Sequence, residues 1–124
     1  MAVRILIVDD AKFTREVISE ILKKKGYKIC GEAENGKEAI EKYKQLKPDA
    51  VTLDIIMPKI DGIDGIDALK EIIKIDPRAK VVMVTALGQK TLELESIKAG
   101  AKEYITKPYQ PLQVVEAVKR VLGG

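Results

Sequence analysis

The feature that most constrains the fold is the regular alternation of short apolar runs with longer amphipathic segments. The runs are four to six residues long, rich in valine and isoleucine, and apolar almost throughout rather than at every second position. Such runs are typical of strands buried on both faces, as in a parallel sheet covered by helices. The predicted strands are Val3–Val8, Tyr27–Glu32, Ala50–Leu53, Val81–Thr85 and Glu103–Thr106.

Each predicted strand is followed by a segment whose apolar residues recur at the spacing of a helix. Five strand–helix pairs predict an α/β protein of one domain, residues 1–124, with a doubly wound parallel five-stranded (βα)5 sheet. The apolar positions expected to face the core are Phe13, Val17, Ile21 and Leu22; Ala39, Ile40, Tyr43 and Leu46; Leu69, Ile72 and Ile73; Leu92, Leu94 and Ile97; and Leu112, Val115, Val118 and Leu122.

The composition excludes several kinds of active site and partner. The chain has no histidine, which removes Ser-His-Asp and Cys-His nucleophile systems and the commonest partner ligand of zinc. A net charge of +3 is too small to indicate nucleic-acid binding, and the lack of a long apolar stretch argues against membrane insertion. The single cysteine, Cys30, excludes an intramolecular disulfide, so we expect a reducing, cytoplasmic location.

Polar side chains lie at the carboxyl ends of four predicted strands. Asp9 and Asp10 follow the first strand, Asp54 follows the third, Thr85 ends the fourth, and Lys107 follows the fifth. In an open parallel sheet these ends meet at one edge, where ligands bind. Each residue alone has an ordinary interpretation. Asp10 could cap the first helix and Asp54 a turn. A threonine is common in strands, and a lysine is usually a solvated surface charge. Their agreement on one edge favours a functional site.

Three carboxylates at one edge require positive charge nearby. Two unit charges about 4 Å apart repel by roughly 4 kcal/mol at an effective dielectric constant of 20. Lys107 supplies one positive charge, and a hard divalent cation would supply the rest. Carboxylates, a carbonyl and waters suit Mg²⁺ better than a softer metal, so the sequence predicts a Mg²⁺ site here.

These residues lie in segments that resemble the receiver domain of two-component response regulators. The blocks "ILIVDD", "VTLDIIMP", "VVMVTA" and "YITKPYQP" occur in the order seen in that family, and "GEAENGKEAIEKYKQLKPD" and "IKAGAKEYI" resemble its connecting segments. The resemblance covers about residues 2 to 122 and is strongest to the stand-alone chemotaxis receivers. It implies the flavodoxin-like strand order 2-1-3-4-5.

The resemblance also implies roles for the acidic residues. Asp54 looks like the phosphoacceptor, which a partner histidine kinase would phosphorylate in a Mg²⁺-dependent reaction. Asp10 and Asp54 would bind Mg²⁺ directly, together with the backbone carbonyl of Ile56, whereas Asp9 would act mainly through a water. Ile56 is apolar at a position that flanks the water path to the phosphorylated aspartate, which implies slow hydrolysis.

The same resemblance implies a switch. Lys107 would pair with the phosphoryl group, Thr85 would hydrogen-bond it, and Tyr104 would swing inward as Thr85 moves. The protein would thus be a signalling receiver rather than an enzyme, although one that catalyses its own phosphorylation and dephosphorylation. The expected target is the flagellar motor switch, with a single-domain phosphorelay receiver or the receiver of a larger regulator as alternatives; we expect a monomer.

A phosphatase with an aspartate nucleophile is the competing interpretation from another class. Haloacid-dehalogenase-type enzymes carry Asp-x-Asp after the first strand, whereas Asp9 and Asp10 are adjacent here and Asp54 is followed by two isoleucines. A flavodoxin-like cofactor carrier is disfavoured because the acidic "DDAKFT" loop would repel a phosphate.

The triplet Ile-Asp-Gly occurs twice in a row at residues 60–65. The receiver pattern expects Asp-Gly seven residues after Asp54, which is Asp61-Gly62, and also five residues before the first core leucine of the third helix, which is Asp64-Gly65. One copy is therefore an insertion of three residues. A calcium loop is disfavoured because its acidic residues stand two apart, not three.

We expect the insertion to leave the third helix in register. Either Asp61 or Asp64 is predicted to cap that helix. Leu69, Ile72 and Ile73 are predicted to keep their core positions, with the extra residues absorbed between Lys59 and Asp67.

Overall fold

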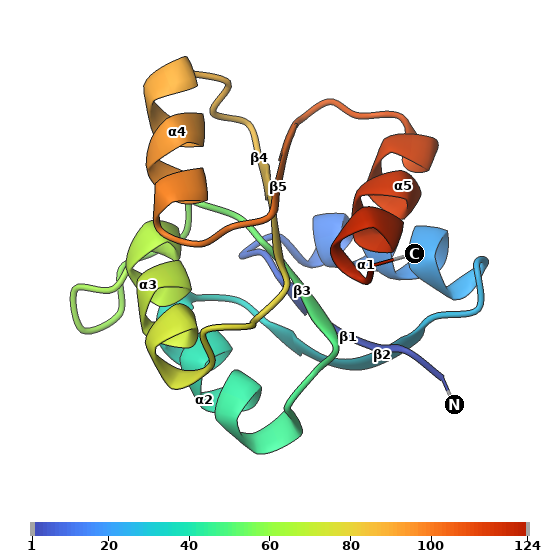
Figure 1. Cartoon of the computed structure of the whole chain (residues 1–124), viewed down its shortest axis with the longest axis horizontal. Coiled ribbons are helices and arrows are strands. Elements are labelled where there is room, and N and C mark those ends of the chain that lie inside the picture. Colours follow the sequence, from blue (N-terminus) through green and yellow to red (C-terminus); the bar gives the residue numbers. More distant parts are fainter. Residues whose placement is uncertain (1, 124) are drawn as a thin grey trace.

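The protein is a five-stranded parallel sheet with helices on both faces, in a computed structural model that describes residues 2–123 (Figure 1). The strand order is β2-β1-β3-β4-β5, which confirms the expected fold class and order. The elements are β1 Arg4–Val8, α1 Lys12–Lys23, β2 Lys28–Ala33, α2 Gly36–Leu46, β3 Ala50–Leu53, α3 Gly65–Ile75, β4 Val81–Thr85, α4 Lys90–Lys98, β5 Glu103–Thr106 and α5 Pro111–Val121.

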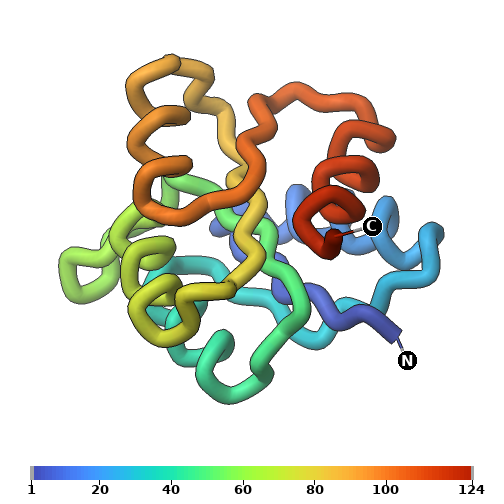
Figure 2. The backbone as a smooth tube through the Cα atoms, in the orientation of Figure 1, coloured from blue at the N-terminus to red at the C-terminus, as the bar shows by residue number. Residues whose placement is uncertain are grey.

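The helices divide between the two faces of the sheet. In Figure 2, α1 and α5 lie together on one side, while α2, α3 and α4 lie on the other. The side chains of β1 alternate accordingly: Ile5 and Ile7 join the core under α1 and α5, whereas Leu6 and Val8 join the core under the other helices. Burial on both faces explains why the strands are apolar at nearly every position. Within residues 2–123, no helix has both the length and the apolarity needed to cross a bilayer.

The predicted core face of α1 was partly wrong. Phe13 is 76% exposed, and Val17 and Ile21 are only half-buried, whereas Ile18 and Leu22 are buried against the sheet. The apolar residues of α1 form two neighbouring stripes, and only one of them faces the sheet. The other borders a groove of about 650 Å³ between α1 and α5.

Three other predicted core residues lie at the surface. Leu94 and Ile97 of α4 are 50% and 43% exposed, and Leu112 of α5 is 58% exposed. In α4 only Leu92 packs against the core, which agrees with the irregular apolar pattern of that segment. Of the four apolar positions predicted for α5, Val115 and Val118 are buried.

The connection between β3 and α3 contains a tight turn that projects beside α3 (Figure 1). The backbone N–H of Ile63 donates to the carbonyl of Ile60 at 3.1 Å, and the two residues form an isolated antiparallel bridge. Asp61 and Gly62 between them both have positive φ, 55° and 75°. Asp-Gly suits such a turn because both residues tolerate the left-handed region. An ion pair of 2.8 Å joins Asp61 to Lys37 at the start of α2.

The second triplet copy starts α3. The Asp64 side chain accepts from the backbone N–H of Asp67 at 2.9 Å, and the Asp67 side chain accepts from the N–H of Asp64 at 3.1 Å, which completes a capping box. Gly65 lies so close to the end of β3 that a Cβ there would be 2.1 Å from the Asp54 carbonyl oxygen. This position therefore requires glycine.

The third helix keeps its register, as predicted. Leu69 and Ile72 are fully buried, and Ile73 is half-buried and packs on the same core. Asp64 and Gly65 make the cap and the close contact, whereas the first triplet forms a turn that closes on itself.

Candidate functional site

The five predicted site residues that end or follow strands come together at the carboxyl edge of the sheet. Asp9 and Asp10 follow β1, Asp54 follows β3, Thr85 is the last residue of β4, and Lys107 follows β5. β1 lies between β2 and β3, so the connections after β1 and β3 are neighbours although they are far apart in sequence. This is the edge at which open α/β sheets bind ligands.

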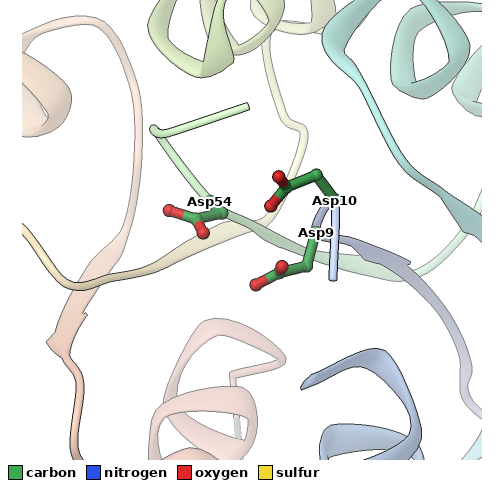
Figure 3. Close-up of side chains that lie close together, drawn as sticks. All are labelled: Asp9, Asp10 and Asp54. Atoms are coloured by element: carbon green, nitrogen blue, oxygen red, sulfur yellow. The ribbon is translucent and has the colours of Figure 1, made fainter. Parts of the chain in front are cut away.

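The three aspartates form a compact acidic cluster (Figure 3). One carboxylate oxygen from each lies within 4.8 Å of the others. Asp9 and Asp54 are only 2% and 5% exposed, whereas Asp10 is exposed at the rim. Asp10 does not cap α1, because the capping position is Ala11, whose N–H donates to Asp9 Oδ1 at 2.9 Å. No side-chain hydrogen bond or ion pair within residues 2–123 engages the Asp10 carboxylate, which lies in the cluster.

Lys107 supplies the positive charge that this cluster needs. Its Nζ donates to Asp9 Oδ2 at 2.7 Å and to Asp54 Oδ2 at 3.1 Å. Its backbone N–H donates to the carbonyl of Thr85 at 2.8 Å, which continues the pairing of β4 with β5, and the Lys107–Pro108 peptide bond is cis. A single ammonium group therefore bridges the two buried carboxylates.

Burial and charge shift the pKa values of this pair. Burial raises the pKa of the Asp54 carboxyl above its ordinary value; the Lys107 charge and a hydrogen bond from Thr85 oppose this shift, and the charge of Asp9 adds to it. Burial alone would lower the pKa of Lys107, but its hydrogen bond to Asp9 and the charge of Asp54 raise it instead. Lys107 is therefore firmly a cation, and further positive charge would favour the ionised form of Asp54.

Thr85 and Tyr104 are linked through one residue. Thr85 is fully buried, and its Oγ1 accepts from the backbone N–H of Leu87 at 3.4 Å. The hydroxyl of Tyr104 on β5 donates to the carbonyl of Leu87 at 2.5 Å. Movement of Thr85 would therefore reach Tyr104 through the backbone at residue 87.

Ile56 contacts Asp54 through its backbone. Its N–H donates to Asp54 Oδ1 at 3.1 Å, so one oxygen of Asp54 closes a local turn while the other pairs with Lys107. The Ile56 side chain is 50% exposed at the mouth of the site. That its carbonyl binds a metal stays a prediction.

Arg15 is a site residue that the sequence did not point out. Its guanidinium donates to the backbone carbonyl of Asp9 at 2.7 Å and pairs with Glu32 of β2 at 2.8 Å. The Arg15 side chain is only 12% exposed, so α1 helps to hold the loop that carries Asp9. An arginine within a helix normally extends to solvent. The only sequence signal for a role at the site is that Arg15 stands six residues after Asp9.

The chemistry of this cluster fits a hard divalent cation. All of its candidate ligand atoms are carboxylate oxygens, two of the carboxylates are buried, and a single ammonium opposes three acidic groups. Oxygen donors of this kind suit Mg²⁺ in proteins.

Comparison with known proteins agrees with this geometry. Residues 5–119 match the response regulator receiver domain family. The chain belongs to that family. It is 56% identical over 121 residues to the chemotaxis protein CheY of Thermotoga maritima, covering 98% of each chain. It is 52% identical over 123 residues to CheY of Bacillus subtilis, covering 99% of this chain and 100% of the relative.

A solved structure shows the same fold. CheY in the CheX–CheY–BeF₃–Mg²⁺ complex of Borrelia burgdorferi superposes with a TM-score of 0.91 and is 40% identical, covering 96% of this chain and 88% of that one. This receiver is therefore a signalling protein closely similar to CheY rather than an enzyme of a conventional class.

Proposed function

We propose that this receiver is a chemotaxis response regulator that is phosphorylated on Asp54 by a partner histidine kinase and then changes its affinity for a downstream target. The observation that carries the proposal is the position of Asp54. It is a buried carboxylate at a strand end, bridged to Asp9 by the ammonium of Lys107. The chemotaxis role is supported by the relatives of this chain that are named CheY, which are similar to it over almost their whole length.

In the proposed reaction an oxygen of Asp54 attacks the phosphorus of a phosphohistidine. The new P–O bond forms as the P–N bond to the donor ring breaks, and the ring, already protonated on its other nitrogen, leaves as neutral imidazole. Lys107, already 3.1 Å from Asp54, is in reach to offset the charge on the transferred group. The donor must be another protein, because this chain has no histidine.

The acidic cluster would hold the metal that this reaction uses. Asp10 and Asp54, with the Ile56 carbonyl, would bind Mg²⁺ directly and Asp9 would do so mainly through a water. When bound, Mg²⁺ supplies positive charge beside the phosphoryl oxygens. The residues of the chain provide the remaining contributions, since Lys107 orients the acceptor and Arg15 holds the loop that carries Asp9.

Phosphorylation would be read out through Thr85. Its buried Oγ1 accepts from the backbone N–H of Leu87, which leaves the hydroxyl proton available, and a phosphoryl group on Asp54 would offer that proton a charged acceptor. Rotation of Thr85 toward that group would free space for Tyr104, whose hydroxyl donates to the Leu87 carbonyl. The element that switches is thus the end of β4 with β5.

Phosphotransfer to the intact protein tests the proposal. The protein is mixed with Mg²⁺ and a small phosphodonor such as acetyl phosphate, and its intact mass is measured. The wild type gains the mass of one phosphoryl group, and so does the control Asp61→Asn, which alters an exposed aspartate of the neighbouring turn. Asp54→Asn gains nothing. An equal gain in Asp54→Asn would refute the assignment.

A binding assay tests the choice of target. A peptide of a flagellar switch protein is immobilised and presented with the protein, with and without beryllofluoride as a phosphoryl mimic. A chemotaxis regulator binds the peptide more tightly with the mimic. A phosphorelay receiver, the alternative from the same family, ignores the peptide in both states.

A further inference from the structure

A hollow of about 420 Å³ lies at the edge of the sheet opposite the aspartate cluster. It is formed where the chain enters β4 and β5 and where α5 ends, so none of its residues belongs to the site described above. We call it the basic hollow. Its lining residues are Pro77, Arg78, Lys80, Lys102, Glu103, Arg120 and Val121.

Positive charge dominates the basic hollow. The lining holds two arginines and two lysines but one carboxylate, Glu103. Arg120 pairs with Glu103 at 2.9 Å and with Glu116 of its own helix at 3.9 Å. Across residues 2–123, no carboxylate lies within salt-bridge distance of Arg78, Lys80 or Lys102. Like charges gathered without partners repel one another, and a bound anion removes that repulsion.

The backbone that carries these cations is held by hydrogen bonds. The carbonyl of Lys80 accepts from the N–H of Val51 at 2.9 Å, and the N–H of Lys102 donates to the carbonyl of Val81 at 2.9 Å. The N–H of Arg78 donates to the side chain of Asp76 at 3.0 Å. Because sheet and turn hydrogen bonds hold all three attachment points, a ligand needs to order only the ends of the side chains.

We propose that the basic hollow binds a small anion that carries two or more phosphate groups. Its volume falls in the range of small-molecule sites. Arginine presents a planar fork that matches phosphate oxygens, and lysine adds point charges, so Arg78 and Arg120 with the two lysines suit a diphosphate. Pro77 and the largely buried Val121 add a small apolar surface, which limits how much water competes for the cations.

A titration with pyrophosphate tests this proposal. Backbone amide signals of the ¹⁵N-labelled protein are followed by NMR in EDTA, so that no divalent ion links pyrophosphate to the aspartates. We expect saturable shifts confined to residues 76–80, 101–103 and 119–121. The double variant Arg78→Glu/Lys102→Glu weakens the apparent affinity by about tenfold or more, because two attractions become repulsions.

The control is Lys23→Glu/Lys25→Glu, which changes the net charge equally at the end of α1, outside the basic hollow. It retains the affinity of the wild type. An equally weakened pyrophosphate affinity in both variants would mean a general effect of charge and would overturn the site. Amide shifts that spread over all surface lysines, or that never saturate, would overturn it too. Saturation of the hollow by a hexaglutamate peptide but not by pyrophosphate would overturn the ligand class. Phosphorylation of each variant by acetyl phosphate confirms its fold, since Asp54 lies at the opposite edge.

Discussion

The two glycines of the repeated triplet should respond to the same substitution in different ways. In Gly65→Ala the new Cβ would be 2.1 Å from the Asp54 carbonyl oxygen and 2.5 Å from the Ile55 Cα. Ordinary contacts begin near 3.4 Å, so the acceptor strand or α3 must move by roughly 1.3 Å. In Gly62→Ala nothing lies within 4 Å of the new Cβ, and the only penalty is the positive φ of 75°.

The expected energies follow from these geometries. Forcing a methyl group against backbone costs about 3 kcal/mol, and alanine recovers up to about 1 kcal/mol in a helix. Gly65→Ala should therefore lose about 2 kcal/mol, or about 8 °C in Tm for a chain of this size. Gly62→Ala should lose about 1 kcal/mol, the cost of a left-handed conformation for alanine.

Thermal unfolding and phosphorylation by acetyl phosphate, measured on both variants, separate the two effects. Gly65→Ala should also slow phosphorylation, because the displaced backbone carries Asp54, whereas Gly62→Ala should react like the wild type. The reasoning would be refuted if Gly62→Ala slowed phosphorylation as much as Gly65→Ala, since the first triplet would then also position the acceptor.

Three further predictions concern single residues. Asp64→Ala removes the capping box of α3 and should cost about 1 kcal/mol of unfolding free energy. Asp61→Asn breaks only an exposed ion pair and keeps a side chain that tolerates the positive φ of this position, so it should cost much less; similar losses in urea unfolding would contradict this. Ile56→Asn places a polar group at the mouth of the site, where it can orient water, so the phosphorylated protein should decay faster, and an unchanged half-life would dismiss the role of Ile56. Burial raises the pKa of the Cys30 thiol, and the charge of Arg4 offsets this shift only in part. At pH 8 the thiol of the folded protein should therefore react with iodoacetamide more slowly than that of urea-unfolded protein, and its rate should increase as the pH rises. Equal rates in the folded and unfolded protein would count against this prediction.

Much of the fold could be predicted because its strands are buried on both faces. The predicted limits of β3, β4 and β5 match the structure, that of β1 differs by one residue at its start, and that of β2 is shifted by one residue at both ends. The candidate site followed from the same pattern, since parallel strands carry their terminal residues to one edge. Asp9, Asp10, Asp54, Thr85 and Lys107 were located in this way before any side-chain contact was known.

The helix faces were harder to predict, for a physical reason. Consecutive residues of a helix differ by about 100° in direction, so Val17 and Ile18 point to different surroundings although both are apolar. Sequence alone could not show that Ile18 meets the sheet while Phe13 lies 76% exposed, because that depends on where α5 crosses α1. The role of Arg15 could not be predicted for a similar reason, since Arg15 lies in α1 and its partner Glu32 lies in β2.

The turn at residues 60–63 also bears on how this gene could change. A tandem, in-frame duplication of the codons for Ile-Asp-Gly adds a segment that supplies its own hydrogen bond and its own left-handed residues. The second copy keeps the cap of α3 and the contact with the Asp54 backbone. Because the second copy keeps both contacts, we expect substitutions in the projecting copy to be tolerated. Residues 60–62 are therefore the place to insert a peptide tag or an environment-sensitive fluorophore that reports on the nearby acceptor.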